Sequence, residues 1–191
     1  MIRPTLALAA TLLGGCAMLP ALAPTAVPPA VARFAAPTFE LAGRLSASDG
    51  THAASGSLEW EHKRAADRWT VYTPLGQIAA RLDSTPDGAE LLTANGERRQ
   101  AASADAMLPE LLGIEVPMTR LGRWVQGAPA ADAEIRAVDG AGRPALVIDQ
   151  GWRIGYLEYH GDGADALPRR LEVSRGDARL RLVIDHWTLA P

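Results

Sequence analysis

Over most of its length the chain alternates apolar and polar residues, the pattern of β-strands that bury one face. In the first such run Phe39, Leu41 and Leu45 share one side, and Glu40 and Arg44 take the other. This alternation is typical of antiparallel strands that pack on a core. The same period predicts strands at 39–48, 54–62, 67–73, 77–84, 88–93, 97–101, 132–138, 144–150, 152–159, 169–175 and 178–188.

Turn residues separate several of these runs. Gly, Asn, Asp and Pro supply the backbone angles that tight reversals need. Such clusters occur at 48–50, 85–88, 94–96 and 175–177. They indicate hairpins or turns between these strands.

A helical period interrupts the strands near the middle of the chain. Ser103 is a suitable N-cap, and Met107 and Leu111 recur at helical spacing before Gly113. Pro109 lies inside this run and should kink the helix or reset its start, because proline lacks the N–H that a helix interior uses.

A second short helix is predicted directly afterwards. Pro117 suits a first helical position, Met118 and Leu121 begin an apolar stripe, and Gly127 ends it. About eleven strands with this helical insertion predict a mainly β fold. We expect a single large curved antiparallel sheet, or unclosed β-barrel, whose concave side is covered by the short helices.

The N-terminus has the features of a bacterial lipoprotein signal. Arg3 precedes a short apolar run at 6–13, and Leu13-Gly14-Gly15-Cys16 follows at once. The run is too short to span a bilayer, so we interpret 1–15 as a cleaved signal peptide that ends at a lipobox. Cys16, the chain's single cysteine, is then the lipidation site; the alternative is a signal peptide that contains a cysteine by chance.

The segment after this cysteine is rich in proline and alanine. Residues 16–37 therefore form the predicted lipidated cysteine and tether, and 38–191 the folded domain. Ala17 is not aspartate, which favours the outer membrane over retention at the inner one. The predicted location is the periplasmic face of the outer membrane.

Composition removes several classes of function. A net charge of −3 without a basic patch argues against nucleic-acid binding. The four histidines have no metal-ligand spacing, and no nucleophile elbow, phosphate loop or dinucleotide fingerprint occurs. We therefore expect no enzyme activity, no cofactor and no metal site.

Large apolar side chains are the candidate interior. The five tryptophans could pack a solid core or line an apolar cavity, and the pattern alone leaves both open. The residues assigned to a cavity or its helical lid are Trp60, Trp69, Met107, Leu111, Met118, Leu121, Trp124 and Trp152.

A further candidate is the turn Thr73-Pro74-Leu75-Gly76. Pro74 and Gly76 set a turn between two strands and leave Leu75 at its tip. Leu75 either folds back onto the sheet or forms an exposed apolar probe for membrane or cargo.

Taken in order, these motifs resemble the LolB family of outer-membrane lipoprotein receptors. The resemblance runs from about Phe39 to Leu189. Its carriers are Phe39-Glu40-Leu41-Ala42-Gly43-Arg44-Leu45, Trp60, Pro74-Leu75-Gly76-Gln77, Leu112-Gly113-Ile114, Val116-Pro117, Leu121, Trp124-Val125-Gln126-Gly127-Ala128-Pro129, Gly151-Trp152, Tyr156, Tyr159, Leu167-Pro168, Arg179-Leu180-Arg181-Leu182-Val183-Ile184 and Trp187.

The resemblance implies an unclosed barrel with a helical lid over an apolar cavity for acyl chains. It also implies that the loop Pro74, Leu75 and Gly76 delivers cargo, and that the chain, as a monomer, accepts acylated lipoproteins from a LolA-like periplasmic carrier and inserts them among outer-membrane lipids. Thr73 stands where relatives often carry asparagine, and Pro109 strains the first helix. The alternative is a lipid-binding or structural outer-membrane lipoprotein with no part in lipoprotein sorting.

Overall fold

The computed structural model describes residues 29–189. The predicted signal peptide, Cys16 and the first part of the tether lie outside the described residues. The described part holds eleven strands and two helices: β1 (Thr38–Ser48), β2 (Ala53–Lys63), β3 (Ala66–Tyr72), β4 (Ile78–Thr85), β5 (Gly88–Thr93), β6 (Arg98–Ala101), α1 (Ala104–Leu112), α2 (Met118–Val125), β7 (Glu134–Val138), β8 (Pro144–Asp149), β9 (Trp152–Tyr159), β10 (Pro168–Arg175) and β11 (Ala178–Leu189).

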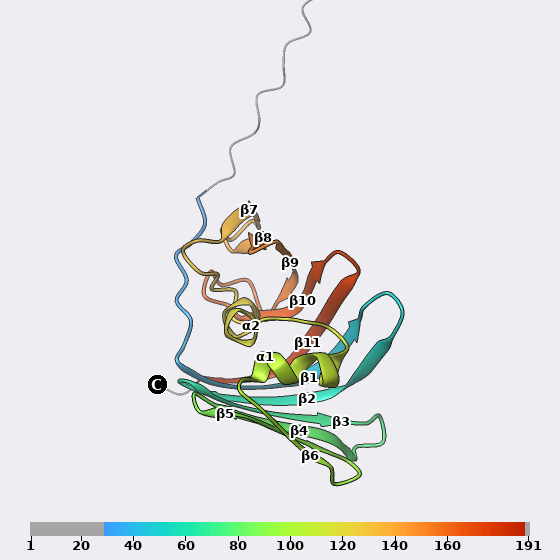
Figure 1. Ribbon diagram of the computed structural model, residues 1–191. Helices are drawn as coiled ribbons and strands as arrows, with labels where there is room; N and C mark the ends of the chain where they lie inside the picture. Colours follow the sequence, from blue (N-terminus) through green and yellow to red (C-terminus); the bar gives the residue numbers. More distant parts are fainter. Residues whose placement is uncertain (1–28, 190–191) are drawn as a thin grey trace, which may run out of the picture.

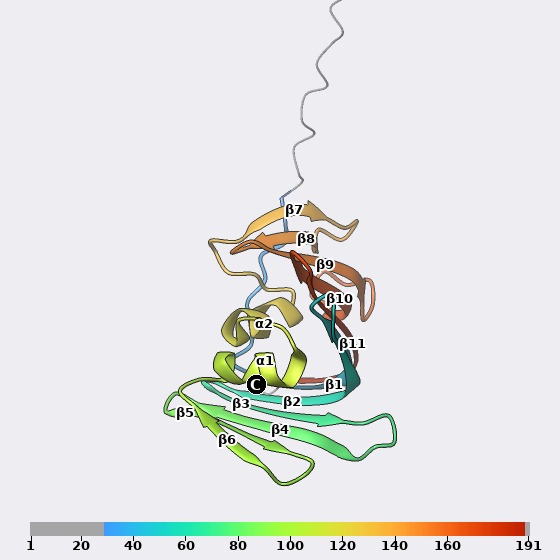
Figure 2. The same cartoon turned by 45° about the vertical axis from the view of Figure 1, so that its right-hand side comes forward.

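All eleven strands form one antiparallel sheet. Its order is β6-β5-β4-β3-β2-β1-β11-β10-β9-β8-β7, so neighbours in sequence pair as hairpins and β1 pairs with β11. The edge strands β6 and β7 do not pair with each other, and the sheet curves around both helices (Figures 1 and 2). The predicted mainly β, unclosed sheet with helices on its concave side is confirmed.

The central pair of strands contains a bulge that accounts for part of the curvature. The register of β1 against β11 shifts between Ala42 and Gly43, and bulges bend the strand that carries them. A Cβ at Gly43 would lie 2.2 Å from the carbonyl oxygen of Val183, so only glycine fits this close approach.

Helix α1 differs from its predicted form at both Ser103 and Pro109. Ser103 occupies the N-cap, but its side chain makes no capping hydrogen bond. Pro109 does not reset the start: the helix begins at Ala104 and continues to Leu112, and Gly113 ends it at a φ of 73°. Pro109 lies inside the helix and has no N–H to donate to the carbonyl of Asp105, so the helix forgoes this one hydrogen bond.

Helix α2 begins one residue later than the sequence suggested. Pro117 is its N-cap rather than its first helical residue. The backbone N–H of Met118 donates to Asp105 Oδ1 at 2.8 Å, so a side chain of α1 satisfies the first turn of α2. The two helices are therefore joined at their N-terminal ends.

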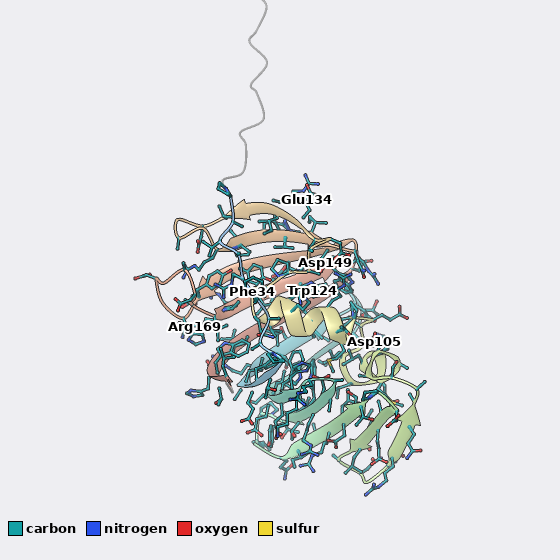
Figure 3. The ribbon with its side chains drawn as sticks, turned by 90° about the vertical axis from the view of Figure 1, so that its left-hand side faces the viewer. Phe34, Asp105, Trp124, Glu134, Asp149 and Arg169 are labelled. Atoms are coloured by element: carbon teal, nitrogen blue, oxygen red, sulfur yellow. The ribbon has the colours of Figure 1, made fainter. Side chains whose placement is uncertain are left out.

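The last part of the predicted tether is docked on the domain. Residues 29–37, which we call the strap, run beside α2 from the β7–β8 turn to the start of β1 (Figures 1 and 3). The Val31 N–H donates to the carbonyl of Gly142 at 2.8 Å, and the Pro37 carbonyl accepts from the N–H of Arg64 at 2.7 Å. The spacer expected from composition thus stays a prediction for residues 16–28 only.

Candidate functional site

The space between sheet and helices is lined by tryptophans. Trp60 and Trp69 lie opposite each other on β2 and β3, with ring centroids 4.9 Å apart. Trp124 of α2 and Trp152 of β9 form a second pair at 6.0 Å. None of these four side chains is more than 1% exposed. The other predicted interior residues, Met107, Leu111, Met118 and Leu121, join the same core.

These side chains fill part of the interior. The ring of Trp60 lies 3.8 Å from where a Cβ would stand on Gly122, so α2 sits directly on the tryptophan layer. The tryptophans therefore fill the part of the interior that lies under α2, whereas open space between the sheet and the helices remains at one end of the sheet. We call the filled region the tryptophan core.

Helix α2 is held in place by polar contacts that sequence reasoning missed. Asp149, only 1% exposed, accepts hydrogen bonds from Trp124 Nε1 at 2.7 Å and from Arg120 at 3.1 Å. Figure 3 shows Trp124 and Asp149 close together where the helix meets the sheet. Arg120 also bridges to Asp132 at 2.8 Å, and this hydrogen bond lowers the pKa of the Asp132 carboxyl.

Tyr156 contributes a second support for the same helix. Its hydroxyl donates to the backbone carbonyl of Trp124 at 2.9 Å. Burial raises the pKa of Tyr156 well above its usual value, so the hydroxyl keeps the proton that it donates.

Two of the four interior tryptophans have buried N–H groups without a partner among the described residues. They are Nε1 of Trp69 and Nε1 of Trp152. A buried unpaired donor costs about 1–3 kcal/mol. These two unpaired N–H groups therefore destabilise the closed tryptophan core, and a hydrogen-bond acceptor that reached them, such as an ester carbonyl, would remove this cost.

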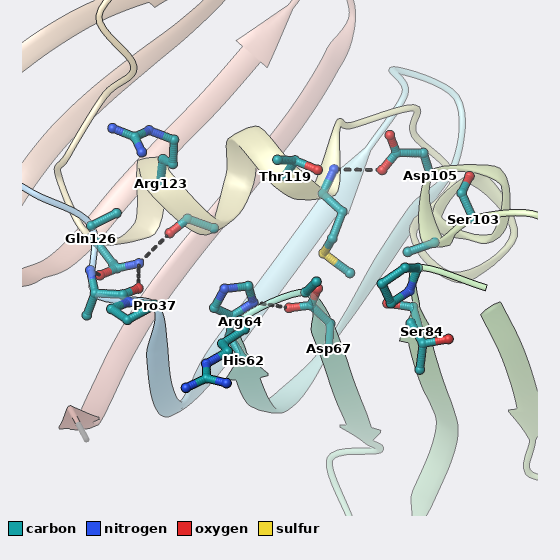
Figure 4. Close-up of a pocket in the computed structure, with 18 of the residues that line it drawn as sticks. Pro37, His62, Arg64, Asp67, Ser84, Ser103, Asp105, Thr119, Arg123 and Gln126 are labelled. Carbon is teal, nitrogen blue, oxygen red and sulfur yellow. Dashed lines mark hydrogen bonds and ion pairs between the residues drawn. The ribbon is translucent and has the colours of Figure 1, made fainter. Parts of the chain in front are cut away.

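One end of the sheet opens into a cavity of about 570 Å³ beneath the strap, lined by both apolar and polar groups (Figure 4). The β2–β3 and β4–β5 turns, both helices and residues 35–37 line it. At its floor Asp67 Oδ1 accepts from Trp60 Nε1 and lies against His62 Nδ1, each at 2.7 Å. Asp67 is thus paired, whereas Nε of Arg123, another lining residue, is buried without a partner among the described residues.

The opposite end of the sheet has an apolar cleft of about 280 Å³. It lies between the C-terminal turn of α1, with Leu111 and Leu112, and the ends of β1 to β5. Leu45, Val71 and Leu91 line it and belong to or pack on the same core. This mainly apolar cleft, which also has Glu110 in its lining, therefore borders the same hydrophobic core as the tryptophans.

Leu75 protrudes at the same end of the sheet as the apolar cleft. The β3–β4 turn is closed by hydrogen bonds between Thr73 and Gln77 and between Gly76 and Thr73, with Gly76 at a φ of 79°. Leu75 is 88% exposed, so the alternative in which it folds back onto the sheet is wrong.

Residues 29–189 offer few groups suited to other chemistry. No cluster of three or more His, Cys, Asp or Glu side chains there could hold a metal ion. Neither helix in this part of the chain is long and apolar enough to cross a membrane.

One missed residue had a visible signal in the sequence. Asp149 follows Val147 by two positions, so strand alternation places its carboxylate on the buried face of β8. A buried acid is usually paired, but the sequence does not show that its partners come from α2.

Comparison with known proteins agrees with this architecture. The family model "Outer membrane lipoprotein LolB" matches residues 37–187. A protein named Outer-membrane lipoprotein LolB from Azoarcus sp. is 60% identical over 84% of this chain and 83% of its own length. A protein of the same name from Thiobacillus denitrificans is 37% identical over 94% of this chain and 93% of its own length.

Among solved structures, a DUF1329 family protein from Desulfovibrio piger aligns with a TM-score of 0.50 at 8% identity, over 81% of this chain and 86% of that one. This likeness concerns the fold alone. The family match covers nearly all of the described domain, and the two curated relatives exceed 30% identity over most of their own length. The chain therefore belongs to the LolB family of outer-membrane lipoproteins.

Proposed function

We propose that this chain accepts lipoproteins from a LolA-like periplasmic carrier, shelters their acyl chains in the tryptophan core and inserts them into the outer membrane. Family membership supports the role in lipoprotein localisation. The observation that carries the mechanism is geometric: the exposed Leu75 and the apolar cleft lie at the same end of a sheet whose interior is aromatic.

The energetic problem is the exposure of acyl chains to water. Each methylene held in water rather than in an apolar environment costs about 0.8 kcal/mol, and an acyl chain has about a dozen of them. Transfer from the carrier to this protein and then to the bilayer is therefore favourable if each environment buries the acyl chain more completely than the one before. The bilayer comes last because it buries the chain completely.

Entry of an acyl chain into the tryptophan core requires α2 to move, because its four tryptophans are fully buried. The backbone of α1 lies close to β4, β5 and β6, whereas α2 makes no comparably close backbone approach within the described residues. Its position depends instead on side chains, chiefly Trp124, Arg120 and their shared partner Asp149. Displacing α2 would uncover the tryptophan core as an acyl-binding surface.

The anchor in this proposal is the lipid on Cys16. Several acyl chains on one residue hold a protein stably at a bilayer, whereas one chain gives only marginal binding. We propose no catalytic step, since transfer needs only differences in burial.

The test is uptake of cargo in solution by a version that lacks residues 1–16. It should acquire an acylated lipoprotein from the carrier and form a complex that co-elutes in gel filtration. The matched control is the same cargo with its acylated cysteine replaced by serine, which should not transfer. A folded version that takes up neither cargo would contradict the receptor function.

The filled interior favours one second candidate, a structural lipoprotein whose tryptophans only stabilise the sheet. A fluorescent fatty-acid probe separates the two. The receptor binds it saturably, whereas the structural lipoprotein shows no saturable site. Mass spectrometry of ligands that co-purify tests the other alternative, in which glycerolipid is the physiological ligand.

A further inference from the structure

The strap binds the domain along one side. Arg33 contacts it through its side chain, and Val31, Ala36 and Pro37 through their backbones. Phe34 lies on the other side, which we call the outward face, and is exposed.

The inward face fixes the strap firmly. Arg33 donates to the carbonyls of Ala164 at 2.6 Å, Ala166 at 2.8 Å and Gln126 at 3.2 Å. Its guanidinium also lies over the ring of Tyr159, 5.7 Å from the centroid. These contacts join the strap to the 161–167 loop and to the end of α2.

Gln126 clamps the strap a second time (Figure 4). Its side-chain oxygen accepts from the N–H of Ala36 at 2.8 Å, and its amide nitrogen donates to the Ala36 carbonyl at 3.4 Å and the Gly122 carbonyl at 2.9 Å. Because Arg33 and Gln126 both hold the strap, its outward face has a fixed position on the domain.

That outward face presents Phe34 to solvent, with 90% of the residue exposed (Figure 3 labels it). Burying a phenylalanine side chain is favourable by about 1.5–3 kcal/mol, so an apolar phase in contact with the docked strap would gain this side chain without first having to order it. Nothing in the described domain covers it.

The length of chain before the strap identifies that partner. Residues 17–28 are twelve residues and span at most ~40 Å when fully extended. If Cys16 carries lipid, as the proposed function requires, the bilayer stays within that reach of the strap. The anchor would then keep the lipid bilayer, an apolar phase, close to Phe34 at all times.

We propose that the strap is a second membrane-contact element, in which Phe34 inserts into the lipid surface next to the anchor. This inference rests on the lipid anchor of the proposed function. The contact is distinct from that of Leu75, because the strap meets the β2–β3 turn whereas Leu75 lies in the β3–β4 turn at the other end of β3. The docked strap would fix how the domain stands on the membrane between deliveries.

The test uses the mature lipidated protein in vesicles of phosphatidylethanolamine and phosphatidylglycerol. Phe34→Cys provides a free thiol, because Cys16 is acylated, and it is labelled with an environment-sensitive fluorophore. We expect the emission to shift to shorter wavelength and to be lost when spin-labelled acyl chains are included. The matched control is Ala32→Cys, also exposed but off the outward face, which should report water.

Each other outcome has a definite meaning. A label at residue 34 that stays in water, or labels at 32 and 34 that respond equally, would overturn the inference. So would a response at residue 34 that requires the carrier rather than vesicles, since the partner would then be protein. Mass spectrometry of the mature N-terminus separates these results from failure of the anchor, because a missing anchor shows as an unacylated Cys16.

Discussion

At the scale of single residues, Leu75 is the side chain on which delivery depends in the proposed function. Replacing Leu75 with Glu should leave folding intact, because the side chain is exposed, but should slow release of cargo into liposomes about tenfold or more. Leu75→Met is the control and should deliver normally. Normal delivery by Leu75→Glu would remove this residue from the mechanism.

Asp149 is the residue that holds α2 in the closed arrangement. Asp149→Ala leaves the Trp124 N–H and Arg120 without their buried acceptor, and should lower the free energy of unfolding by about 3 kcal/mol. Asp132→Ala removes the other, largely exposed partner of Arg120 and should cost less than ~1 kcal/mol. Urea denaturation measures both, and equal losses would show that Asp149 has no special role.

At the scale of elements, the two helices should differ in mobility. Helix α1 lies close to three strands, whereas α2 is held by side chains, so amides of α2 should exchange hydrogen faster than those of α1. Mass spectrometry after deuterium labelling measures this. Protection of α2 equal to that of β1 and β11, the central strands, would contradict lid movement by α2.

Strands were predictable from the sequence because one buried face imposes a period of two. Every predicted strand is present, with ends that differ by no more than two residues, as at 132–138 against Glu134–Val138. Helix caps were less predictable, since the partner of the first turn of α2 is Asp105, a residue of another helix. Capping of that kind depends on tertiary contact.

The sequence allowed a prediction of which residues form the candidate site, but not of how their side chains pack. The tryptophans were expected either to pack a solid core or to line an apolar cavity, and the structure buries four of the five in the core. The docking of the strap was missed because its composition is that of a spacer. Its attachment depends on Arg33 and Gln126, which are 93 positions apart in the sequence.

At the scale of the whole molecule, the sheet has an opening at each of two opposite ends. The cavity beneath the strap lies at one end, and the apolar cleft lies at the other, beside the exposed Leu75. We expect acyl chains to enter at the Leu75 end, because Leu75 is an exposed apolar side chain that can contact them first. The central claim is that these chains reach the tryptophan core.

Fluorescence quenching by a cargo with brominated acyl chains tests this claim most directly. In a Trp187→Phe variant all remaining tryptophans are the four interior ones. The account predicts that brominated cargo, bound and co-purified, quenches most of their emission, whereas the unbrominated cargo does not. Stable binding of the brominated cargo with unchanged tryptophan emission would show that the chains lie elsewhere and contradict the account.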